Sequence, residues 1–326
     1  MRLDEFSLIR RFWQNLTPQH PLTLHGIGDD AAVCQVPVGQ QLVVTTDTLV
    51  AGVHFPLATR PEDLGYKTLA VNLSDLAAMG AQPAWVLLAL TLPEIQEAWL
   101  AAFAQGFGAL AHRHGVELIG GDMTQGPLTV TVQALGWVPA GQAVRRGGAQ
   151  PGDWIYVSGT VGDAGLALLH LQGELRGLDI TTQTAVLTRL HRPTPQVALG
   201  LLLRECASAA VDISDGLAAD LNHILTASGV GASVQVAQLP LSAALQPHLA
   251  AAGGYALPLN AGDDYELCFT VPPSRQALLE TRCAAAGIPI TWVGIIERQS
   301  GLRCIAPDGT DITPGRLGYQ HFRNDS

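Results

Sequence analysis

The sequence has only one lysine, Lys67, and every other strongly basic side chain is an arginine. This scarcity excludes two widespread nucleotide-binding motifs, because each places a lysine on the phosphates of the nucleotide. There is no Gly-x-x-x-x-Gly-Lys-Ser/Thr sequence, and no lysine-bearing strand is followed by a His-Arg-Asp loop. We therefore expect binding of phosphate by this chain to rely mainly on arginine, backbone N–H groups and metal ions.

Positive charge is also scarce in total. The chain has 18 Lys and Arg against 28 Asp and Glu, for a net charge of −10. A nucleic-acid-binding surface needs Lys and Arg clustered on one face, so we do not expect a nucleic-acid partner. With 48% hydrophobic and 14% charged residues, the composition is typical of a compact globular protein.

Paired cysteines and long apolar runs are missing too. None of the five cysteines forms a Cys-x-x-Cys pair, which argues against a disulfide framework or a zinc knuckle. Residues 1–13 mix acidic and basic side chains and lack the apolar core of a signal peptide, and no later run is long enough to span a membrane. We therefore expect a cytoplasmic protein without a membrane partner.

A length of 326 residues predicts two domains. Residues 139–152, PAGQAVRRGGAQPG, have the Gly- and Pro-rich composition of a connector. We place an N-terminal domain at 1–138 and a C-terminal domain at 139–326. Helical and strand patterns alternate in both, which predicts the α/β (α+β) fold class.

The periodicity of apolar residues predicts the individual elements. In the first domain we expect helices at 3–15, 61–79 and 94–114, and strands at 41–47, 84–92 and 127–138. In the second we expect strands at 153–158, 209–213, 232–236, 265–271 and 290–296, and helices at 162–172, from Pro193 or Pro195 to about 206, 215–228, 241–252 and 273–287.

Aspartate recurs beside glycine, serine or threonine where apolar stretches end. Six such corners occur: Gly28-Asp29-Asp30, Thr45-Thr46-Asp47, Ser74-Asp75, Gly120-Gly121-Asp122, Asp212-Ile213-Ser214-Asp215-Gly216 and Gly262-Asp263-Asp264. Mg²⁺ takes oxygen ligands, often one or two carboxylates completed by water and substrate phosphates. Aspartate also serves in turns and helix caps, and Asp215 and Asp263 fit that alternative best. The recurrence of the corners in a chain with one lysine favours a shared divalent-cation cluster.

Two further features suit phosphate groups. The Gly120-Gly121-Asp122 corner would let backbone approach phosphates while Asp122 holds a metal ion, and Arg145-Arg146 could grip phosphate from the connector. The alternative for the arginine pair is a solvated surface position. With metal, glycine and arginine all present, phosphoryl transfer is the chemistry that this set indicates.

Taken in order, the aspartate corners and the residues around them are similar to the motifs of a known family. They are Gly28-Asp29-Asp30-Ala31-Ala32, Thr45-Thr46-Asp47-Thr48-Leu49 with Gly52-Val53-His54-Phe55, Asn72-Leu73-Ser74-Asp75 with Ala78-Met79-Gly80-Ala81, Gly120-Gly121-Asp122, Asp212-Ile213-Ser214-Asp215-Gly216, and Gly262-Asp263-Asp264-Tyr265-Glu266-Leu267. In this order and spacing they resemble the thiamine-monophosphate kinase family. The likeness runs from Glu5-Phe6 to Gly318-Tyr319-Gln320-His321-Phe322, which is practically the whole chain.

The resemblance implies the fold of the aminoimidazole-ribonucleotide synthetase superfamily. In that fold the N-terminal domain forms a barrel across a homodimer interface, and the C-terminal α/β domain completes the active site. The implied reaction is the final step of thiamine diphosphate biosynthesis, in which ATP phosphorylates thiamine monophosphate with the help of several Mg²⁺ ions. Transfer is direct and in line, so no acid, base or nucleophile from the protein is expected.

The resemblance also implies roles for residues that match the family motifs. The implied magnesium ligands are Asp30, Thr45, Thr46, Asp47, Asp75, Asp122, Asp212 and Asp215. The implied nucleotide contacts are Gly121, Asp122, Arg146 and Ser214, and the implied substrate contacts are His54, Glu266 and Tyr319. Tyr319 stands where many relatives carry Trp, which keeps a flat ring for stacking.

Three other functions remain to be separated from this one. One alternative is another member of the same superfamily, such as selenophosphate synthetase or aminoimidazole-ribonucleotide synthetase; the first should show a reactive Cys or selenocysteine with a lysine in an early Gly-rich segment, but no Cys precedes Cys34. A non-enzymatic divalent-metal-binding protein would favour an Asp-x-Asp-x-Asp-Gly calcium loop, which is missing. A metal-dependent phosphohydrolase is the third alternative, because a two-metal site can also activate water.

Overall fold

The computed structural model describes residues 5–319 of the chain. The chain forms two compact units. The first runs up to Leu76 and includes Ala81–Ala143, whereas Ala77–Gly80 and the residues from Val144 onward form the second. Each unit combines helices with one main sheet, so the predicted α/β (α+β) class is confirmed.

The main sheet of the first unit has four strands in the order β3-β6-β4-β5. Their bounds are β3 (Gln40–Val50), β4 (Gln82–Leu92), β5 (Glu117–Gln125) and β6 (Thr129–Pro139). β6 pairs antiparallel with both β3 and β4, and β4 pairs parallel with β5. β3 and β5 are therefore the two edge strands.

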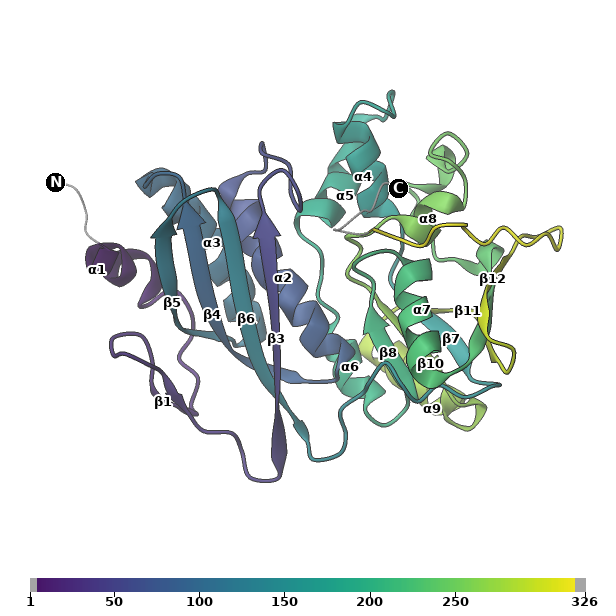
Figure 1. Ribbon diagram of the computed structural model, residues 1–326, viewed down its shortest axis with the longest axis horizontal. Helices are drawn as coiled ribbons and strands as arrows, with labels where there is room; N and C mark the ends of the chain where they lie inside the picture. The colour runs from purple at the N-terminus through teal and green to yellow at the C-terminus, as the bar shows by residue number, and fades with distance from the viewer. Residues whose placement is uncertain (1–4, 320–326) are drawn as a thin grey trace, which may run out of the picture. The chain divides into compact units, whose positions relative to one another are not determined.

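Two long helices, α2 (Pro61–Ala78) and α3 (Glu97–His114), cover one face of this sheet (Figure 1). α2 begins at a proline, which has no N–H to leave unpaired in the first turn. α3 ends where Gly115 takes a left-handed φ of 65°. α1 (Glu5–Leu8) and the π-helical η1 (Ile9–Trp13) precede the sheet.

The opposite face of this sheet is only partly covered. At one end the hairpin of β1 (Thr23–His25) and β2 (Val33–Cys34) packs with its flanking residues near Trp85 and Trp137. Beyond it, Leu42 and Val44 of β3 remain 47% and 49% exposed. The sheet therefore presents apolar side chains that nothing in this chain's described residues fully covers.

The second unit is built on six strands in the order β12-β9-β11-β7-β10-β8. Their bounds are β7 (Trp154–Ser158), β8 (Ala209–Asp212), β9 (Gly231–Gln235), β10 (Leu267–Val271), β11 (Ile290–Glu297) and β12 (Gly301–Ile305). β9 and β12 pair parallel, and the other neighbours pair antiparallel.

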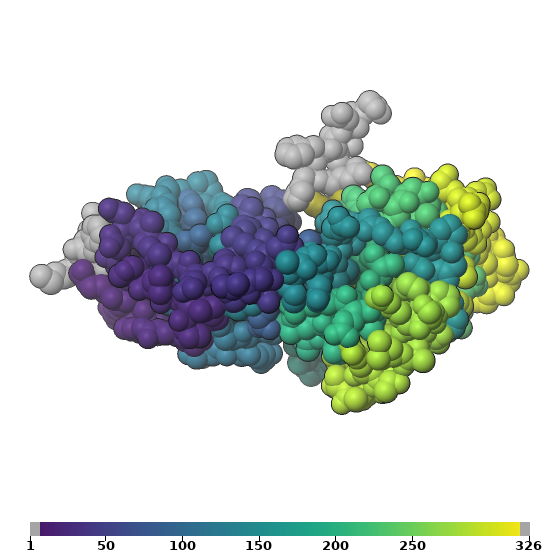
Figure 2. Space-filling model, turned by 90° about the horizontal axis from the view of Figure 1, so that it is seen from below, coloured from purple at the N-terminus to yellow at the C-terminus, as the bar shows by residue number. Residues whose placement is uncertain are grey.

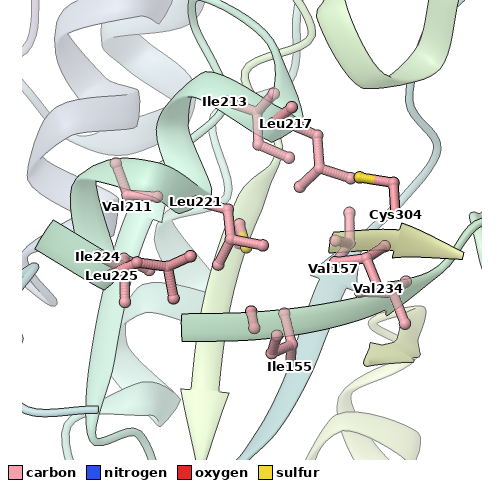
Figure 3. Close-up of a cluster of buried hydrophobic side chains, with 14 of the residues drawn as sticks. Ile155, Val157, Val211, Ile213, Leu217, Leu221, Ile224, Leu225, Val234 and Cys304 are labelled. Atoms are coloured by element: carbon pink, nitrogen blue, oxygen red, sulfur yellow. The ribbon is translucent and has the colours of Figure 1, made fainter. Parts of the chain in front are cut away.

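Helices and short turns surround this second sheet. They are α4 (Asp163–Leu171), α5 (Ile180–His191), α6 (Val197–Leu203), α7 (Leu217–Ser228), η2 (Val236–Gln238), η3 (Gln246–His248), α8 (Ala256–Asn260), η4 (Pro273–Arg275) and α9 (Gln276–Ala286). α7 packs Leu221 and Ile224 into a cluster with Ile155 and Val234 of the sheet (Figure 3). α9, light green in Figure 2, buries only Leu279 and Cys283 and lies at the surface.

Most predicted helices and strands appear close to their expected bounds. The predicted helix 241–252 is wrong: only η3 forms there, because Pro247 has no N–H for an interior helical hydrogen bond. The observed elements outside the predicted ranges are β1, β2, β5, α5, α8 and β12. The glycines of β5 were interpreted only as a corner, since paired glycines are typical of turns.

No helix in residues 5–319 combines the length and apolar character that a membrane span requires.

Candidate metal and nucleotide site

Strand β3 and helix α2 bring predicted metal ligands together in the first unit. Thr45 Oγ1 donates a hydrogen bond to Asp75 Oδ2 at 2.5 Å, and the Asp47 N–H donates to Asn72 Oδ1 at 3.1 Å. Asn72 is fully buried and donates in turn to the carbonyl of Thr68. α2 therefore holds the middle of β3 through two side chains, one of which is the predicted ligand Asp75.

The three consecutive predicted ligands of β3 do not share a face. Successive side chains of a strand point to opposite faces, so Thr45 and Asp47 face α2 whereas Thr46 faces the other way. Thr46 Oγ1 donates to the Val132 carbonyl at 3.1 Å. These residues also lie inside β3, which continues to Val50, rather than in a loop after Asp47. A cation on the α2 side can use oxygens of Thr45 and Asp47, whereas a role for Thr46 stays a prediction.

Gly121 and Asp122 lie in β5, the edge strand opposite β3. Gly121 has a φ of 153°, and a Cβ there would stand 1.8 Å from the Leu88 carbonyl oxygen, so only glycine fits beside β4. Asp122 is exposed and accepts a hydrogen bond from Thr124 Oγ1 at 3.1 Å.

The strand order separates Asp122 from the β3 ligands. Three strand spacings of about 4.8 Å place β5 roughly 14 Å from β3. Within one chain the sheet therefore does not bring Asp122 to Asp47. The prediction that both bind magnesium then requires separate ion positions, which agrees with a need for several ions.

Asp30 and His54 lie in turns of the first unit. Asp30 is exposed between β1 and β2, and its N–H donates to Asp29 Oδ1 at 2.8 Å. His54 follows β3, and its Nδ1 accepts the Val50 N–H at 2.9 Å. The neutral ring then has its proton on Nε2, which is the nitrogen through which His54 would donate to an anionic group.

In the second unit, Asp212 ends β8 and the following residues form a tight corner before α7. Asp212 is 5% exposed. The N–H groups of Ser214, Asp215 and Gly216 all donate to one oxygen, Oδ2 of Asp220, at 3.0, 3.0 and 3.1 Å. The N-cap residue of α7 is Gly216 rather than Asp215. Burial raises the pKa of Asp220 to about 7, although the N–H groups oppose this shift.

The segment from Gly262 to Tyr265 is strained and lies against this corner. Asp263 and Tyr265 have φ values of 69° and 50°, which cost a non-glycine residue about 1–2 kcal/mol each. Their N–H groups donate to the carbonyls of Ser214 and Ile213, at 2.9 and 2.8 Å. A strained backbone conformation persists only where surrounding contacts stabilise it, and these two hydrogen bonds are such contacts.

Glu266 follows that segment and is 1% exposed. Its Oε1 accepts a hydrogen bond from Arg189 Nη2 at 2.6 Å. Its Oε2 accepts from Ser158 Oγ at 2.6 Å and from Gln196 Nε2 at 2.8 Å. A direct contact with substrate would require one of these hydrogen bonds to be exchanged, so the substrate-binding role of Glu266 stays a prediction.

Three carboxyl groups surround the single guanidinium of Arg189. Besides Glu266, Asp163 lies 4.0 Å from Arg189 Nε, and Asp264 is 2% exposed beside them. Burial raises the pKa of Asp264 well above its usual range, and its Oδ1 has no hydrogen-bond partner among the described residues. Burial raises the pKa of Glu266 as well, although Arg189, Ser158 and Gln196 oppose that shift. One guanidinium cannot fully balance three buried carboxylates.

Arg146 and Tyr319 complete the predicted set. The Arg146 side chain is exposed on a backbone tied to β8, where the Ala210 N–H donates to the Arg145 carbonyl at 3.1 Å. The Tyr319 N–H donates to the Asp215 carbonyl at 3.1 Å, and Tyr319 is 42% exposed. The remaining family-like residues, 320–322, lie outside the described part of the chain.

The donors are of a kind that suits magnesium. Among residues 5–319, no three His, Cys, Asp or Glu side chains gather as a metal site. Magnesium does not need such a cage, because water and substrate phosphates complete its octahedron around one or two carboxylates. Asp47 and Asp75, with the Thr45 hydroxyl between their elements, offer oxygen donors without competing His or Cys ligands.

Three residues that organise these sites were missed in the sequence: Asn72, Arg189 and Asp220. Asp220 had a usable signal, because it falls three residues after Leu217 and four before Ile224, on the apolar stripe of the predicted helix. An acidic residue on an apolar stripe has to find buried donors. Asn72 belongs to the Asn72-Leu73-Ser74-Asp75 motif, but the resemblance implies no role for it. Arg189 lies on α5, which the sequence patterns do not predict.

Comparison with known proteins defines the class first. Residues 28–138 match the family described as AIR synthase related protein, N-terminal domain, and residues 150–306 match its C-terminal domain. Both halves of the chain are thus AIR synthase-related domains.

Relatives that align over the full length narrow this class. The chain is 47% identical to a thiamine-monophosphate kinase of Salmonella typhimurium strain LT2 over 323 residues, which cover 99% of each protein. It is 50% identical to a thiamine-monophosphate kinase from Stenotrophomonas maltophilia K279a of known crystal structure, with a TM-score of 0.86 over 94% of this chain and 97% of that one. A solved structure described as AaThiL complexed with AMPPCP and TMP is 32% identical, with a TM-score of 0.77 and 99% of each chain covered. The chain belongs to the thiamine-monophosphate kinase family.

Proposed function

We propose that this chain transfers the γ-phosphoryl group of ATP to thiamine monophosphate, forming thiamine diphosphate and ADP. The observation that carries the proposal is the 47% identity to a thiamine-monophosphate kinase over 99% of both chains. A 32% identical relative was solved with AMPPCP and TMP. The Asp, Gly and Arg positions that phosphoryl transfer would use are present in both units.

Magnesium has a defined place in this proposal. Bound Mg²⁺ neutralises charge on the phosphate oxygens of two anionic substrates. In the first unit we assign its ligands to Asp47 and Asp75, supported by Thr45 and Asn72, because these residues share the β3–α2 contact. Asp30, Thr46, Asp122, Asp212 and Asp215 are further proposed ligands, and the separation of Asp122 from β3 within the first sheet supports more than one ion.

The nucleotide and the acceptor use different residues. For ATP we assign Gly121, where backbone can approach phosphate, together with Asp122, Arg146 and Ser214. For thiamine monophosphate we assign His54 as a donor to the phosphate, and Glu266 and Tyr319 as partners of the cationic thiazolium and the flat aminopyrimidine. The exposed ring of Tyr319 suits stacking or a cation–π contact.

The reaction needs no proton transfer by the protein. An oxygen of the thiamine monophosphate phosphate is already ionised and attacks the γ-phosphorus in line. One P–O bond forms as the bond to the β–γ bridging oxygen breaks, and ADP leaves. The task of the chain is to position both anions and to offset their repulsion.

We propose a cytoplasmic homodimer, and the partly covered face of the four-stranded sheet supports its dimeric state. Leu42 and Val44 are about half exposed there, and burying such a face against a second copy would remove apolar surface from water. The partner that we assign to this face is a second copy of this chain.

The proposal is tested with purified protein, ATP and MgCl₂, with and without thiamine monophosphate. We expect equal amounts of ADP and thiamine diphosphate, formed only when the acceptor and Mg²⁺ are both present. Release of ADP and inorganic phosphate without the acceptor would indicate a phosphohydrolase instead. No turnover with any acceptor would refute the proposed function.

A further inference from the structure

Asp220 organises the corner that follows β8, although it belongs to no motif of the family likeness. It lies in the first turn of α7 and is 2% exposed. Its Oδ2 accepts the N–H groups of three consecutive residues, Ser214, Asp215 and Gly216, within 3.0 to 3.1 Å. One carboxylate oxygen thus determines the direction of three successive peptide groups.

Three consecutive N–H groups ahead of a helix usually form a site for a phosphate or another anion. Here that position is filled from inside the chain by the Asp220 carboxyl group. A phosphate cannot use these N–H groups while Asp220 occupies them. Ser214 and Asp215 can therefore act on a ligand through their side chains, but not through their N–H groups.

The rest of the corner lies close against neighbouring backbone. A Cβ on Gly216 would stand 2.7 Å from Asn260, and one on Gly262 would stand 2.3 Å from the Ser214 carbonyl oxygen. The carbonyls of Ser214 and Asp215 accept from Asp263 and from Tyr319. With its carbonyls engaged on one side, the corner depends on Asp220 for its N–H groups.

We propose that Asp220 is a positioning residue for nucleotide and metal binding, which acts by holding the Ser214–Gly216 corner in the geometry that these ligands need. This inference rests on the proposed function, because Asp212, Ser214 and Asp215 are the residues assigned there to metal and ATP. In this proposal Asp220 contacts neither ligand directly, because its Oδ2 is engaged by the three N–H groups. Its effect reaches them through the three peptide N–H groups.

Two substitutions distinguish the positioning role of the Asp220 side chain from an effect of its negative charge. Asp220→Asn keeps an oxygen that can accept all three N–H groups but removes the negative charge. Asp220→Leu has a similar size and accepts nothing, so it leaves three buried donors unpaired. The control is Leu221→Ala, the next residue of α7, which lies in the core cluster of Figure 3 and lowers stability without touching the corner.

Calorimetry of Mg-AMPPCP binding and full kinetics are measured for each folded variant. We expect Asp220→Leu to weaken Mg-AMPPCP binding and to raise the ATP KM by roughly 10- to 100-fold, because small misplacements of positioning groups have effects of that order. The KM for thiamine monophosphate should change less than the ATP KM. Asp220→Asn and Leu221→Ala should stay within about threefold of the wild type, which is the rescue that positioning requires.

Other outcomes overturn the inference. Normal nucleotide binding in Asp220→Leu would show that the corner does not need the anchor, and equal losses in Asn and Leu would show that charge, not position, matters. If Asp220→Leu does not fold, Asp220→Ala, which is smaller and also accepts no hydrogen bond, decides by the same binding measurement: weakened Mg-AMPPCP binding supports the anchor and normal binding overturns it. If the wild type binds Mg-AMPPCP but makes no thiamine diphosphate, the proposed function fails while the binding test of Asp220 still stands.

Discussion

At the scale of single residues, the clearest consequence concerns Asp47 and Asp75, which β3 and α2 place at one contact. Asp47→Asn and Asp75→Asn each remove a charge at nearly constant volume. We expect each to lower kcat/KM by on the order of 10²–10³, as for loss of an electrostatic contact to the transition state, with the fold retained. Steady-state kinetics over a range of Mg²⁺, with circular dichroism as the folding control, measure this.

The control for these variants is Asp29→Asn, an exposed neighbour of a predicted ligand with no assigned role. It should behave as the wild type. Near-normal turnover of Asp47→Asn and Asp75→Asn at saturating Mg²⁺ would show that the two carboxylates are not ligands.

Arg146 and Arg145 form a matched pair, because both are exposed and adjacent. Arg146→Ala should raise the ATP KM by at least about tenfold, since arginine binds phosphate through two parallel hydrogen bonds that alanine cannot make. Arg145→Ala should change it little. Equal effects of Arg146→Ala on the KM values of ATP and thiamine monophosphate would contradict the nucleotide assignment.

Asp264 predicts a pH dependence of stability. Burial raises its folded-state pKa well above the unfolded value of about 4, so the folded chain keeps a proton that the unfolded chain releases. Its contribution to stability is complete below pH 4 and declines as pH rises towards the folded pKa. Asp264→Asn removes this titration. As pH rises from 5 to 8, the unfolding free energy of the Asp264→Asn variant should therefore fall less than that of the wild type. Urea denaturation at both pH values measures the difference, and parallel curves would refute the assignment.

At the scale of elements, one buried amide connects β3 to α2. Asn72 accepts the Asp47 N–H and donates to the Thr68 carbonyl, so Asn72→Ala leaves buried polar groups unpaired. We expect it to lower the unfolding free energy by about 1–3 kcal/mol and to increase the Mg²⁺ concentration needed for half-maximal activity. Denaturant titration and a Mg²⁺ titration of the rate measure the two effects.

Ser74 offers the control for Asn72 on the same helix. It is fully buried, and its Oγ has no hydrogen-bond partner among the described residues. Ser74→Ala should therefore leave the unfolding free energy and the Mg²⁺ concentration for half-maximal activity nearly unchanged. If Asn72→Ala also leaves the Mg²⁺ requirement unchanged, the β3–α2 contact stabilises the fold but does not place the metal.

At the scale of the whole molecule, the partly covered sheet face predicts self-association. Val44→Asp puts a charge where a second copy would bury apolar surface, so we expect the mass in solution to fall from dimer to monomer. Analytical ultracentrifugation measures this. Ile180→Asp, which changes a 79% exposed residue of the second unit, should leave the dimer intact. An unchanged mass for Val44→Asp would place any interface elsewhere.

The sequence by itself predicted the fold class and most of the elements, since these depend on local patterns. Pro61 marks the start of α2 and Gly115 the end of α3 because both act within one helical turn. The ordered aspartate motifs identified the family, because they can be found without knowing which strands pair. Residues 241–252 have the composition of a helix, but Pro247 in their middle limits them to the short η3.

The tertiary structure decided which of these residues meet. The strand order separates Asp122 from Asp47, and Thr46 faces away from its two neighbours in β3. Glu266 is buried against Arg189. Asp220 accepts the N–H groups of the corner that follows Asp212. These facts depend on pairings between segments up to about a hundred residues apart. A sequence motif records which donors and carboxylates are present, whereas their distances, burial and pKa values arise only when distant strands and helices pack together.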